Sequence, residues 1–261
     1  WELESPALRA LRAKIRKGKK TLKEVYGSPM RGVGTGLNSA FTIDTPTKDR
    51  LCAEDPKSVE LIKPFLEGKD LKRWRAEPRG LWLIYIPKNR VKIDDYPAIR
   101  NWLLPFKAKL EKRATKQEWY ELQQAQEAYI PRFIEPKVIY NRFTDKPNFA
   151  FVDEPLFTND APYFVSTNDR SLAALMNSNV SWLLLSTEAT PLRGGFVQLL
   201  GRYVEPLPIP KMNDEQKANL SNLVQKIQSY ADDALTLQTG LTRRIPDLCP
   251  PERDPKLTTK L

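Results

Sequence analysis

Apolar and polar residues follow one another along this chain in short blocks, and several of the blocks are typical of β-strands. Residues 81–86 form a dense apolar and aromatic run between Gly80 and Pro87, which predicts a buried strand. A strand-like alternation also begins at Phe41 and Ile43. Three further β-rich runs, punctuated by Pro, Asn and Asp, predict strands at 138–140, 149–152 and 163–165.

Helical spacing of apolar residues predicts helices before and between these strands. A helix is expected over 6–17, with Ser5 as its N-cap and Pro6 in its first turn. The stretch 45–66 should hold two short helices, the first capped by Thr47 and the second opened by Asp55 and Pro56. Two longer patterns predict a helix over 94–113, kinked at Pro105, and a further helix over 115–128.

The last hundred residues favour helices again. Short helices are expected over 168–176 and 180–186. A long amphipathic helix is expected from Asn213 to Leu241, with Gly240 as its stop. Its apolar stripe, which we expect to be buried, includes Leu223, Ile227 and Tyr230. Together with the strands, this pattern predicts an α+β fold of short strands and helices with a long C-terminal helix.

The charge balance points to an acidic partner. The chain has 261 residues, a formal net charge of +10 and a pI near 9.5, and such an excess favours binding to nucleic acid. Residues 1–31 alone carry nine Lys or Arg against three Glu. The two cysteines, Cys52 and Cys249, suggest neither a disulfide framework nor a zinc site, and we expect a reduced, cytoplasmic location. No apolar run is long enough to predict a membrane span.

A basic cluster precedes the predicted strand at 81–86. Lys69, Lys72, Arg73 and Arg75 surround Trp74, and such a loop, held by a rigid sheet, suits a phosphate backbone and unstacked bases. The alternative is a solvated turn with Trp74 in the core. The sequence alone leaves both interpretations open.

The sequence contains few residue patterns that could form a catalytic site. The chain has no histidine, which excludes Ser-His-Asp and Cys-His sites and His-ligated metals. A magnesium nuclease would need an acid, then Asp or Glu one residue before a Lys, and Asp55, Glu67 and Lys69 have that spacing. Glu135 and Lys137 supply half of the same pattern, but such matches arise by chance in a Glu- and Lys-rich chain.

Two cofactor patterns are also missing. The glycines at 32, 34 and 36 are followed by a strand-like pattern rather than the helix that a dinucleotide-binding loop requires. The Asn/Asp-Pro-Pro-aromatic tetrad of adenine-specific DNA methyltransferases does not occur, since Pro250 and Pro251 lie between Cys249 and Glu252. We therefore expect neither chemistry within these residues.

Seven segments, in this order, resemble a known family. They are GLNSAF, LIKPFLEGKDLKRW, GLWLIYIP, PFKAKLEKRATKQEWYEL, VIYNRFTDKPNFAFV, TPLRGGF and EPLPIP, spread over residues 30–210. The series resembles the TaqI-like C-terminal specificity domain, the target recognition module of adenine-specific DNA methyltransferases and of fused type IIG restriction-modification enzymes. Residues 63–73 match its Pro-Phe-Leu-x-Gly-x-Asp region, and Arg193, Gly194 and Gly195 match its Arg-Gly-Gly segment.

The resemblance implies a sequence-specific module for double-stranded DNA that has no catalysis and no cofactor of its own. Its partners would be DNA and the N-terminal methyltransferase domain of the same enzyme. That enzyme would use S-adenosylmethionine, and Mg²⁺ if a nuclease domain is fused. From the resemblance and the charge pattern together, the candidate DNA-binding residues are Arg31, Lys69, Lys72, Arg73, Arg75, Arg193 and Arg202.

The expected organisation has four parts. Residues 1–29 would form a linker helix from a missing catalytic part, 30–210 the recognition domain, 211–242 the long helix and 243–261 an extended tail. Two other functions stay open at this point. One is the magnesium nuclease, and the other is a protein-interaction module that uses the long helix as its interface.

Overall fold

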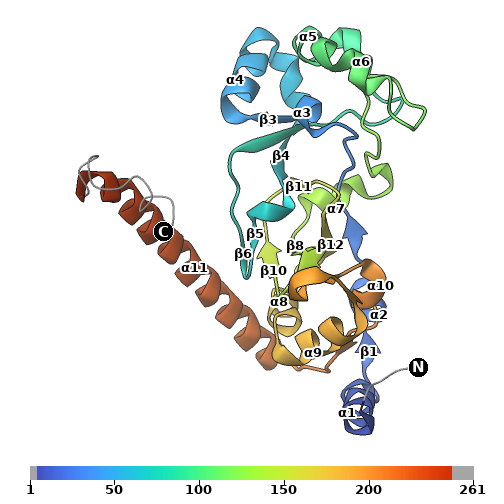
Figure 1. Cartoon of the computed structure of the whole chain (residues 1–261), viewed down its shortest axis with the longest axis vertical. Coiled ribbons are helices and arrows are strands. Elements are labelled where there is room, and N and C mark those ends of the chain that lie inside the picture. Colours follow the sequence, from blue (N-terminus) through green and yellow to red (C-terminus); the bar gives the residue numbers. More distant parts are fainter. Residues whose placement is uncertain (1–4, 249–261) are drawn as a thin grey trace.

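A four-stranded antiparallel sheet lies at the centre of the fold (Figure 1). The computed structural model describes residues 5–248. The strands of this central sheet are, in spatial order, β10 (Phe149–Val152), β8 (Lys137–Asn141), β12 (Pro162–Ser166) and β2 (Met30–Arg31). Successive side chains of β8 point to opposite faces, and both faces are buried. This sheet therefore has a layer packed on each side of it.

One layer is the lobe drawn at the top of Figure 1. Its sheet has the order β11 (Phe157–Thr158), β4 (Ile62–Leu66), β7 (Leu81–Ile84) and β3 (Thr42–Asp44). Helical segments surround that sheet: α3 (Asn38–Phe41), α4 (Thr45–Glu54), η1 (Pro56–Glu60), η3 (Ile93–Asp95), α5 (Pro97–Leu103), η4 (Leu104–Phe106) and α6 (Lys107–Leu110). The segments η5 (Glu127–Tyr129) and α7 (Ile130–Ile134) lead back to the central sheet.

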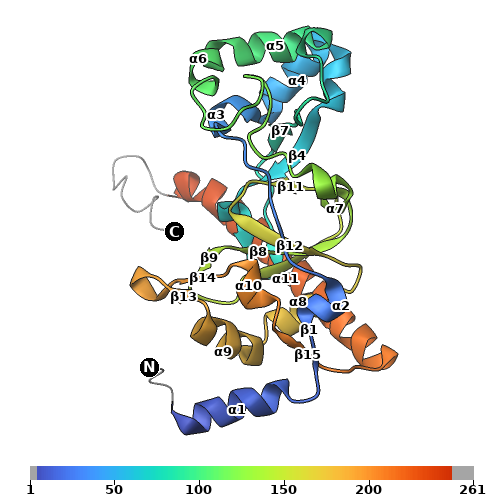
Figure 2. The same ribbon diagram turned by 90° about the vertical axis from the view of Figure 1, so that its right-hand side faces the viewer.

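Helices and small sheets cover the other face. They are α2 (Leu22–Tyr26), α8 (Ser171–Met176), α9 (Asn179–Glu188) and α10 (Gly201–Val204). Helix α1 (Pro6–Arg16) lies outside them, at the bottom of Figures 1 and 2, and its Arg12 and Arg16 pair with Glu188 of α9. A two-stranded sheet pairs β1 (Lys20–Thr21) with β15 (Pro208–Ile209), and a three-stranded sheet has the order β13 (Thr190–Pro191), β14 (Val197–Gln198) and β9 (Phe143–Thr144). The last helix, α11 (Asp214–Leu248), crosses this region and projects away from it (Figures 1 and 2).

The α+β class and most strands agree with the sequence prediction. All five predicted strand regions contain strands, although the one expected from Phe41 begins at Thr42. The helix at the N-terminus has Ser5 as its cap, with a 3.2 Å bond from the amide of Leu8. Asp55 and Pro56 open η1 as expected. The cap of α4, however, is Asp44, which accepts from the amide of Thr47 at 2.9 Å.

Three predicted helical segments are wrong. Residues 62–66, placed at the end of a helix, form the strand β4. The segment 94–113 is broken into short helical pieces, with a 3₁₀ turn around Pro105. The segment 115–128 has no α-helix. Its backbone carbonyls instead accept from the Arg113 guanidinium, at 2.9 Å for Trp119 and 2.7 Å for Glu121. A partly buried arginine therefore replaces the helical hydrogen bonds there.

The long helix also differs from its prediction. It begins at Asp214, with the side chain of Asn213 accepting from the amide of Gln216 at 2.8 Å, but it continues past Gly240 to Leu248. Its expected buried stripe is buried only in part: Val224 of that stripe is 1% exposed, whereas Leu223 and Tyr230 are 53% and 71% exposed. Residues 243–248 of the expected extended tail are helical, and 249–261 lie outside the described residues.

Lys137 gives the first testable consequence of this packing. Its side chain is fully buried, its ammonium donates to the carbonyls of Phe133 (2.9 Å) and Glu135 (2.8 Å), and burial lowers the pKa of Lys137 to about 8. In the unfolded chain the lysine has its ordinary pKa of 10.5. Between these two values the unfolded chain binds more protons, so raising the pH favours the folded state. Relative to Lys137→Met, the wild type should therefore gain stability from about pH 8 to 10.5, measured by urea unfolding. A pH-independent difference would contradict the assignment.

Candidate nucleic-acid interface

The basic cluster forms a hairpin laid against the edge of the central sheet. It consists of η2 (Gly68–Asp70), β5 (Leu71–Lys72) and β6 (Arg75–Ala76). Trp74 lies in the turn with φ 76°, and its amide donates to the carbonyl of Phe149 at 3.0 Å. This bond holds the turn at the start of β10, where Lys72 and Arg73 are exposed.

Buried polar contacts fix the base of the hairpin. Asp70 is 3% exposed, accepts from the amide of Glu67 at 3.0 Å and forms an ion pair with Arg79. Asn141 donates to the carbonyl of Gly68 at 2.8 Å, and a Cβ at position 68 would lie only 2.8 Å from the Asn141 side chain. Asp70 thus has a structural role, and glycine is required at 68 for close approach.

The strand register gathers most of the candidate cations at one end of the central sheet. Asn141, the last residue of β8, is paired with Pro162 of β12, and Tyr163 of β12 is paired with Arg31 of β2. The hairpin turn contacts Phe149, the first residue of β10, at the same end. Arg31, Lys69, Lys72 and Arg73 therefore belong to one surface, although 42 residues of sequence separate the first from the last. We call it the cationic end.

The Arg-Gly-Gly segment reaches this surface through the three-stranded sheet. It forms the turn η6 (Arg193–Gly195) between β13 and β14, and Gly194 and Gly195 have φ values of 73° and 79° that favour glycine. Strand β14 pairs with β9, which follows β8 directly. Arg193 is exposed at the turn. The segment is thus joined to the end of β8 through β9.

Arg202 lies at the base of the same segment. Its guanidinium donates to the hydroxyl of Tyr203 at 2.9 Å, and that hydroxyl is 2.7 Å from the hydroxyl of Thr190. These hydrogen bonds lower the pKa of Tyr203. Arg202 itself is exposed. Arg202 therefore lies on α10, and Tyr203 links it to Thr190 of β13, the strand that precedes the Arg-Gly-Gly turn.

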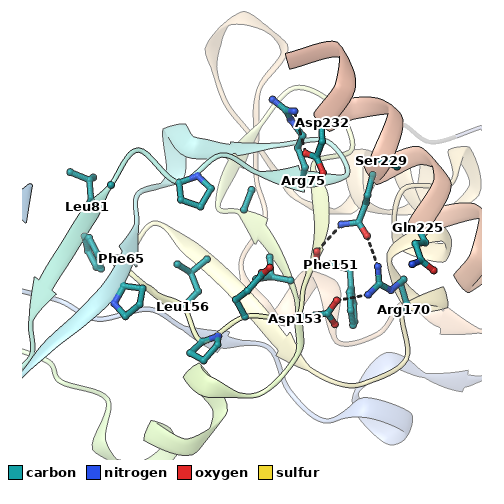
Figure 3. A pocket seen from close by; sticks show the side chains of 18 of the residues that line it. Phe65, Arg75, Leu81, Phe151, Asp153, Leu156, Arg170, Gln225, Ser229 and Asp232 are labelled. Carbon is teal, nitrogen blue, oxygen red and sulfur yellow. Dashed lines mark hydrogen bonds and ion pairs between the residues drawn. The ribbon is translucent and has the colours of Figure 1, made fainter. Parts of the chain in front are cut away.

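Arg75 does not belong to the surface. It is 7% exposed, forms an ion pair with Glu77 and contacts the carbonyl of Ala231 and the carboxylate of Asp232 on α11 (Figure 3). Lys72 and Arg75 are cross-strand partners, so strand alternation does not separate them. What differs is that α11 packs on Arg75, a contact that a count of charges cannot reveal. We correct the sequence prediction at this residue: Arg75 attaches the hairpin to α11.

A glutamine on α11 completes this attachment. The side-chain amide of Gln228 donates to the carbonyls of Trp74 (2.9 Å) and Phe151 (2.8 Å), and its oxygen accepts from Arg170 at 3.0 Å. A buried carbonyl without a hydrogen-bond donor would lower the stability of the folded state. The long helix thereby holds the left-handed turn that presents Lys72 and Arg73.

Two cations of the surface were missed in the sequence. Arg142 and Lys146 lie in the connection between β8 and β10, and Lys146 is exposed. The guanidinium of Arg142 stacks over the ring of Phe143, with 5.0 Å to its centroid. Both residues occur in the segment VIYNRFTDKPNFAFV, between the predicted strands at 138–140 and 149–152. Their place in the connection between two strands could have indicated that they belong to the surface.

The opposite end of β10 has the opposite charge. Asp153 and Glu154 follow the strand there and line a cleft of about 830 Å³ together with Asp232 and Asp233 of α11. Its floor is apolar, formed by residues that include Phe65, Leu81 and Leu156 (Figure 3). Arg170 at its wall is paired with Asp153. A polyanion would be attracted to the cationic end and repelled from this cleft.

The nuclease pattern does not assemble. Asp55 caps η1 by accepting from the amide of Lys57 at 3.2 Å, and it also accepts from the hydroxyl of Ser58 at 2.9 Å. Glu67 pairs with Arg79 at 2.8 Å and with Lys69 at 2.9 Å. Lys137 of the second match is fully buried. Within residues 5–248, no group of three or more His, Cys, Asp or Glu side chains is placed to hold a metal ion. Nor does any helix of that range have the length and hydropathy to cross a bilayer.

Comparison with known proteins agrees with this geometry. The model of the TaqI-like C-terminal specificity domain matches residues 63–209. The chain belongs to this family. The match covers more than half of the chain and includes both the hairpin and the Arg-Gly-Gly segment, so the resemblance seen in the sequence is confirmed.

Two curated relatives of this specificity domain are type II methyltransferases. M.PaeR7I of Pseudomonas aeruginosa is 26% identical over 232 residues, which is 82% of this chain and 38% of that protein. M.XhoI of Xanthomonas vasicola is 21% identical over 227 residues, or 83% of this chain and 40% of that protein. The chain thus spans about two fifths of the length of these relatives.

A solved structure has the same fold. The type IIL restriction-modification enzyme MmeI, in complex with DNA, matches 79% of this chain and 28% of its own, with a TM-score of 0.56 and 12% sequence identity. At this identity the likeness concerns the arrangement of the elements and carries no residue-level correspondence.

Proposed function

We propose that this chain is the recognition domain that directs an adenine-specific DNA methyltransferase, or a restriction enzyme that also methylates, to a short sequence in double-stranded DNA. The observation that carries the proposal is that Arg31, Lys72 and Arg73 lie at one end of the central sheet, in a member of the specificity-domain family. The relatives named as type II methyltransferases supply the class of parent enzyme.

The roles of the residues follow from their chemistry. The exposed cations of the cationic end contact phosphates, release counterions and set the orientation of the duplex without reading its sequence. The glycines at 194 and 195 let the backbone of that turn approach DNA closely while the Arg193 guanidinium forks onto a phosphate.

Catalysis belongs, in this proposal, to the parent enzyme. Its methyltransferase domain holds S-adenosylmethionine and extrudes the target adenine, because a base cannot react inside the duplex. The present chain contributes position and sequence choice. It carries no methyltransferase tetrad, and the carboxylates of the nuclease pattern are engaged in a cap and in ion pairs. Mg²⁺ would be needed only where a nuclease domain is fused.

A selection from randomised duplexes tests the proposal. The purified 261-residue chain should enrich a short common motif, and it should neither methylate nor cut the selected DNA when S-adenosylmethionine and Mg²⁺ are added. Failure to bind DNA, or binding without any enriched motif, would contradict the proposal. Failure to bind would favour the protein-interaction module, for which the exposed Leu223, Tyr230 and Leu237 of α11 offer a surface.

A further inference from the structure

A second site, in which the carboxamide side chains of Asn38, Gln123 and Gln124 gather, adjoins the cationic end. After Arg31 the chain leaves the central sheet as a glycine-rich loop, residues 32–38, and passes residues 123 and 124. Between them lies an open hollow of about 550 Å³, which we call the amide pocket. Its lining comprises Arg31, Gly34, Thr35, Gly36, Leu37, Asn38, Gln123, Gln124 and Asp160.

The two glycines explain why the pocket is open. Gly34 and Gln124 exchange backbone hydrogen bonds of 2.9 and 2.8 Å, and a Cβ at position 34 would lie 3.2 Å from the Cβ of Gln124. At Gly36, where φ is 75°, a Cβ would lie 2.7 Å from both the Arg113 side chain and the side-chain oxygen of Gln123. Side chains at these positions would displace the glutamines that line the pocket.

The hydrogen-bonding groups of the pocket are available to a ligand. The side chains of Gln123 and Gln124 form none of the hydrogen bonds found among residues 5–248, and Gln124 is exposed. Asn38 accepts from the hydroxyl of Thr35 at 2.5 Å, which leaves its amide group to donate outward. Arg31 is held at the rim by Asp160, with bonds of 2.6 Å to its carboxylate and 3.1 Å to its carbonyl.

Neutral amides and cations suit different parts of a nucleic acid. Phosphates are bound mainly by charged groups, which supply affinity and no sequence information. A side-chain amide has a donor and an acceptor side by side, and this pair matches N7 and the N6 amino group of adenine in the major groove. The pocket joins such amides to Arg31, which ends the strand that the register places at the cationic end.

We propose that Gln124 reads the major-groove edge of an adenine in the target sequence, with Gln123 and Asn38 as its neighbours in the same pocket. The inference rests on the proposed function, since it assigns base choice within that function to a specific side chain. It divides the surface in two: the cations at 72, 73 and 193 bind any duplex, and Gln124 distinguishes one base pair.

The test compares duplex selections for the wild-type chain, Gln124→Ala and Gln124→Glu, with Gln225→Ala on α11 as the control. Gln225 is an exposed glutamine on the acidic cleft and should leave both motif and affinity unchanged. Gln124→Ala should lose preference at one A·T pair, with an affinity for the selected target roughly ten-fold or more lower and an unchanged affinity for random duplex. Gln124→Glu should shift that position toward C, because a carboxylate accepts from the cytosine amino group.

The outcomes separate the two proposals. If the wild-type chain enriches a motif and both Gln124 variants keep it unchanged, the inference is wrong while the proposed function stands. If the wild-type chain enriches no motif, the proposed function itself fails, and the inference fails with it. A melting curve for each variant excludes loss of fold as the cause of a changed motif.

Discussion

Truncation of Phe133 to alanine is expected to lower the free energy of unfolding by about 3–5 kcal/mol. Phe133 is fully buried on α7 and stacks on Phe157 of β11, with ring centroids 4.7 Å apart and an interplanar angle of 14°. On its other side it packs at 5.0 Å against Phe164 of β12. The ring of Phe133 therefore contacts both the sheet of the upper lobe and the central sheet. Its removal would leave a cavity between them, and the two sheets could not close over it because other contacts hold each of them in place.

The neighbouring residue supplies the control. Ile134 is 55% exposed, so Ile134→Ala should change the free energy of unfolding by no more than about 0.5 kcal/mol. Urea unfolding of both variants measures the contrast. If Phe133→Ala unfolds at the same urea concentration as Ile134→Ala, the stability of the fold does not depend on the contact that Phe133 makes between the upper lobe and the central sheet.

The elements that could be predicted from the sequence are those in which local and tertiary signals coincide. The run at 149–152 is β-rich in composition and buried on both faces, so its strand is predicted correctly. Asp55 followed by Pro56 fixes the start of η1 by local hydrogen bonding and a preset φ. The helix predicted over 115–128 does not form; carbonyls of this segment accept instead from the side chain of Arg113, six and eight residues earlier, and the spacing of apolar residues cannot record such a side-chain contact.

The sequence predicts which residues belong to the candidate site better than it predicts how they are arranged. The sequence identifies Lys72, Arg73 and Arg193 by charge and by family resemblance, but their positions relative to the central sheet come from the contact of the hairpin with Phe149 and from the pairing of β14 with β9. Arg75 has the same residue type and lies two positions from Arg73, but it is buried against α11, a part of the chain more than 150 residues away, and no local pattern records that contact. Gln124 has no charge and stands in a segment predicted to be helical, so no signal in the sequence singles it out.

The second large effect concerns DNA affinity. The triple variant Lys72→Ala, Arg73→Ala, Arg193→Ala should lose roughly 500-fold in affinity at 0.1 M salt, and the loss should vanish as the salt concentration approaches 1 M. The reason is that each phosphate contact contributes about −0.9 to the slope of log affinity against log salt concentration. Since these contacts read no bases, target and random duplexes should be affected about equally.

A control variant with the same loss of charge distinguishes the effect of lost phosphate contacts on DNA affinity from the effect of a lower net charge. Lys57, Lys217 and Lys226 are three exposed lysines on η1 and α11, none of them in the strands, turns or connection that make up the cationic end. Their simultaneous replacement by alanine removes the same formal charge. It should change the slope by much less than one unit, because long-range charge is screened beyond about 10 Å at 0.1 M salt.

The salt titration of the two triple variants beside the wild type, on one target and one random duplex, is the most direct test that the cationic end holds DNA. We predict that the slope of log affinity against log salt concentration falls in magnitude by about 2.7 for the variant at positions 72, 73 and 193, on both duplexes, and stays near the wild-type value for the control. Equal slopes for the wild type and the variant at 72, 73 and 193 would contradict the assignment of this surface.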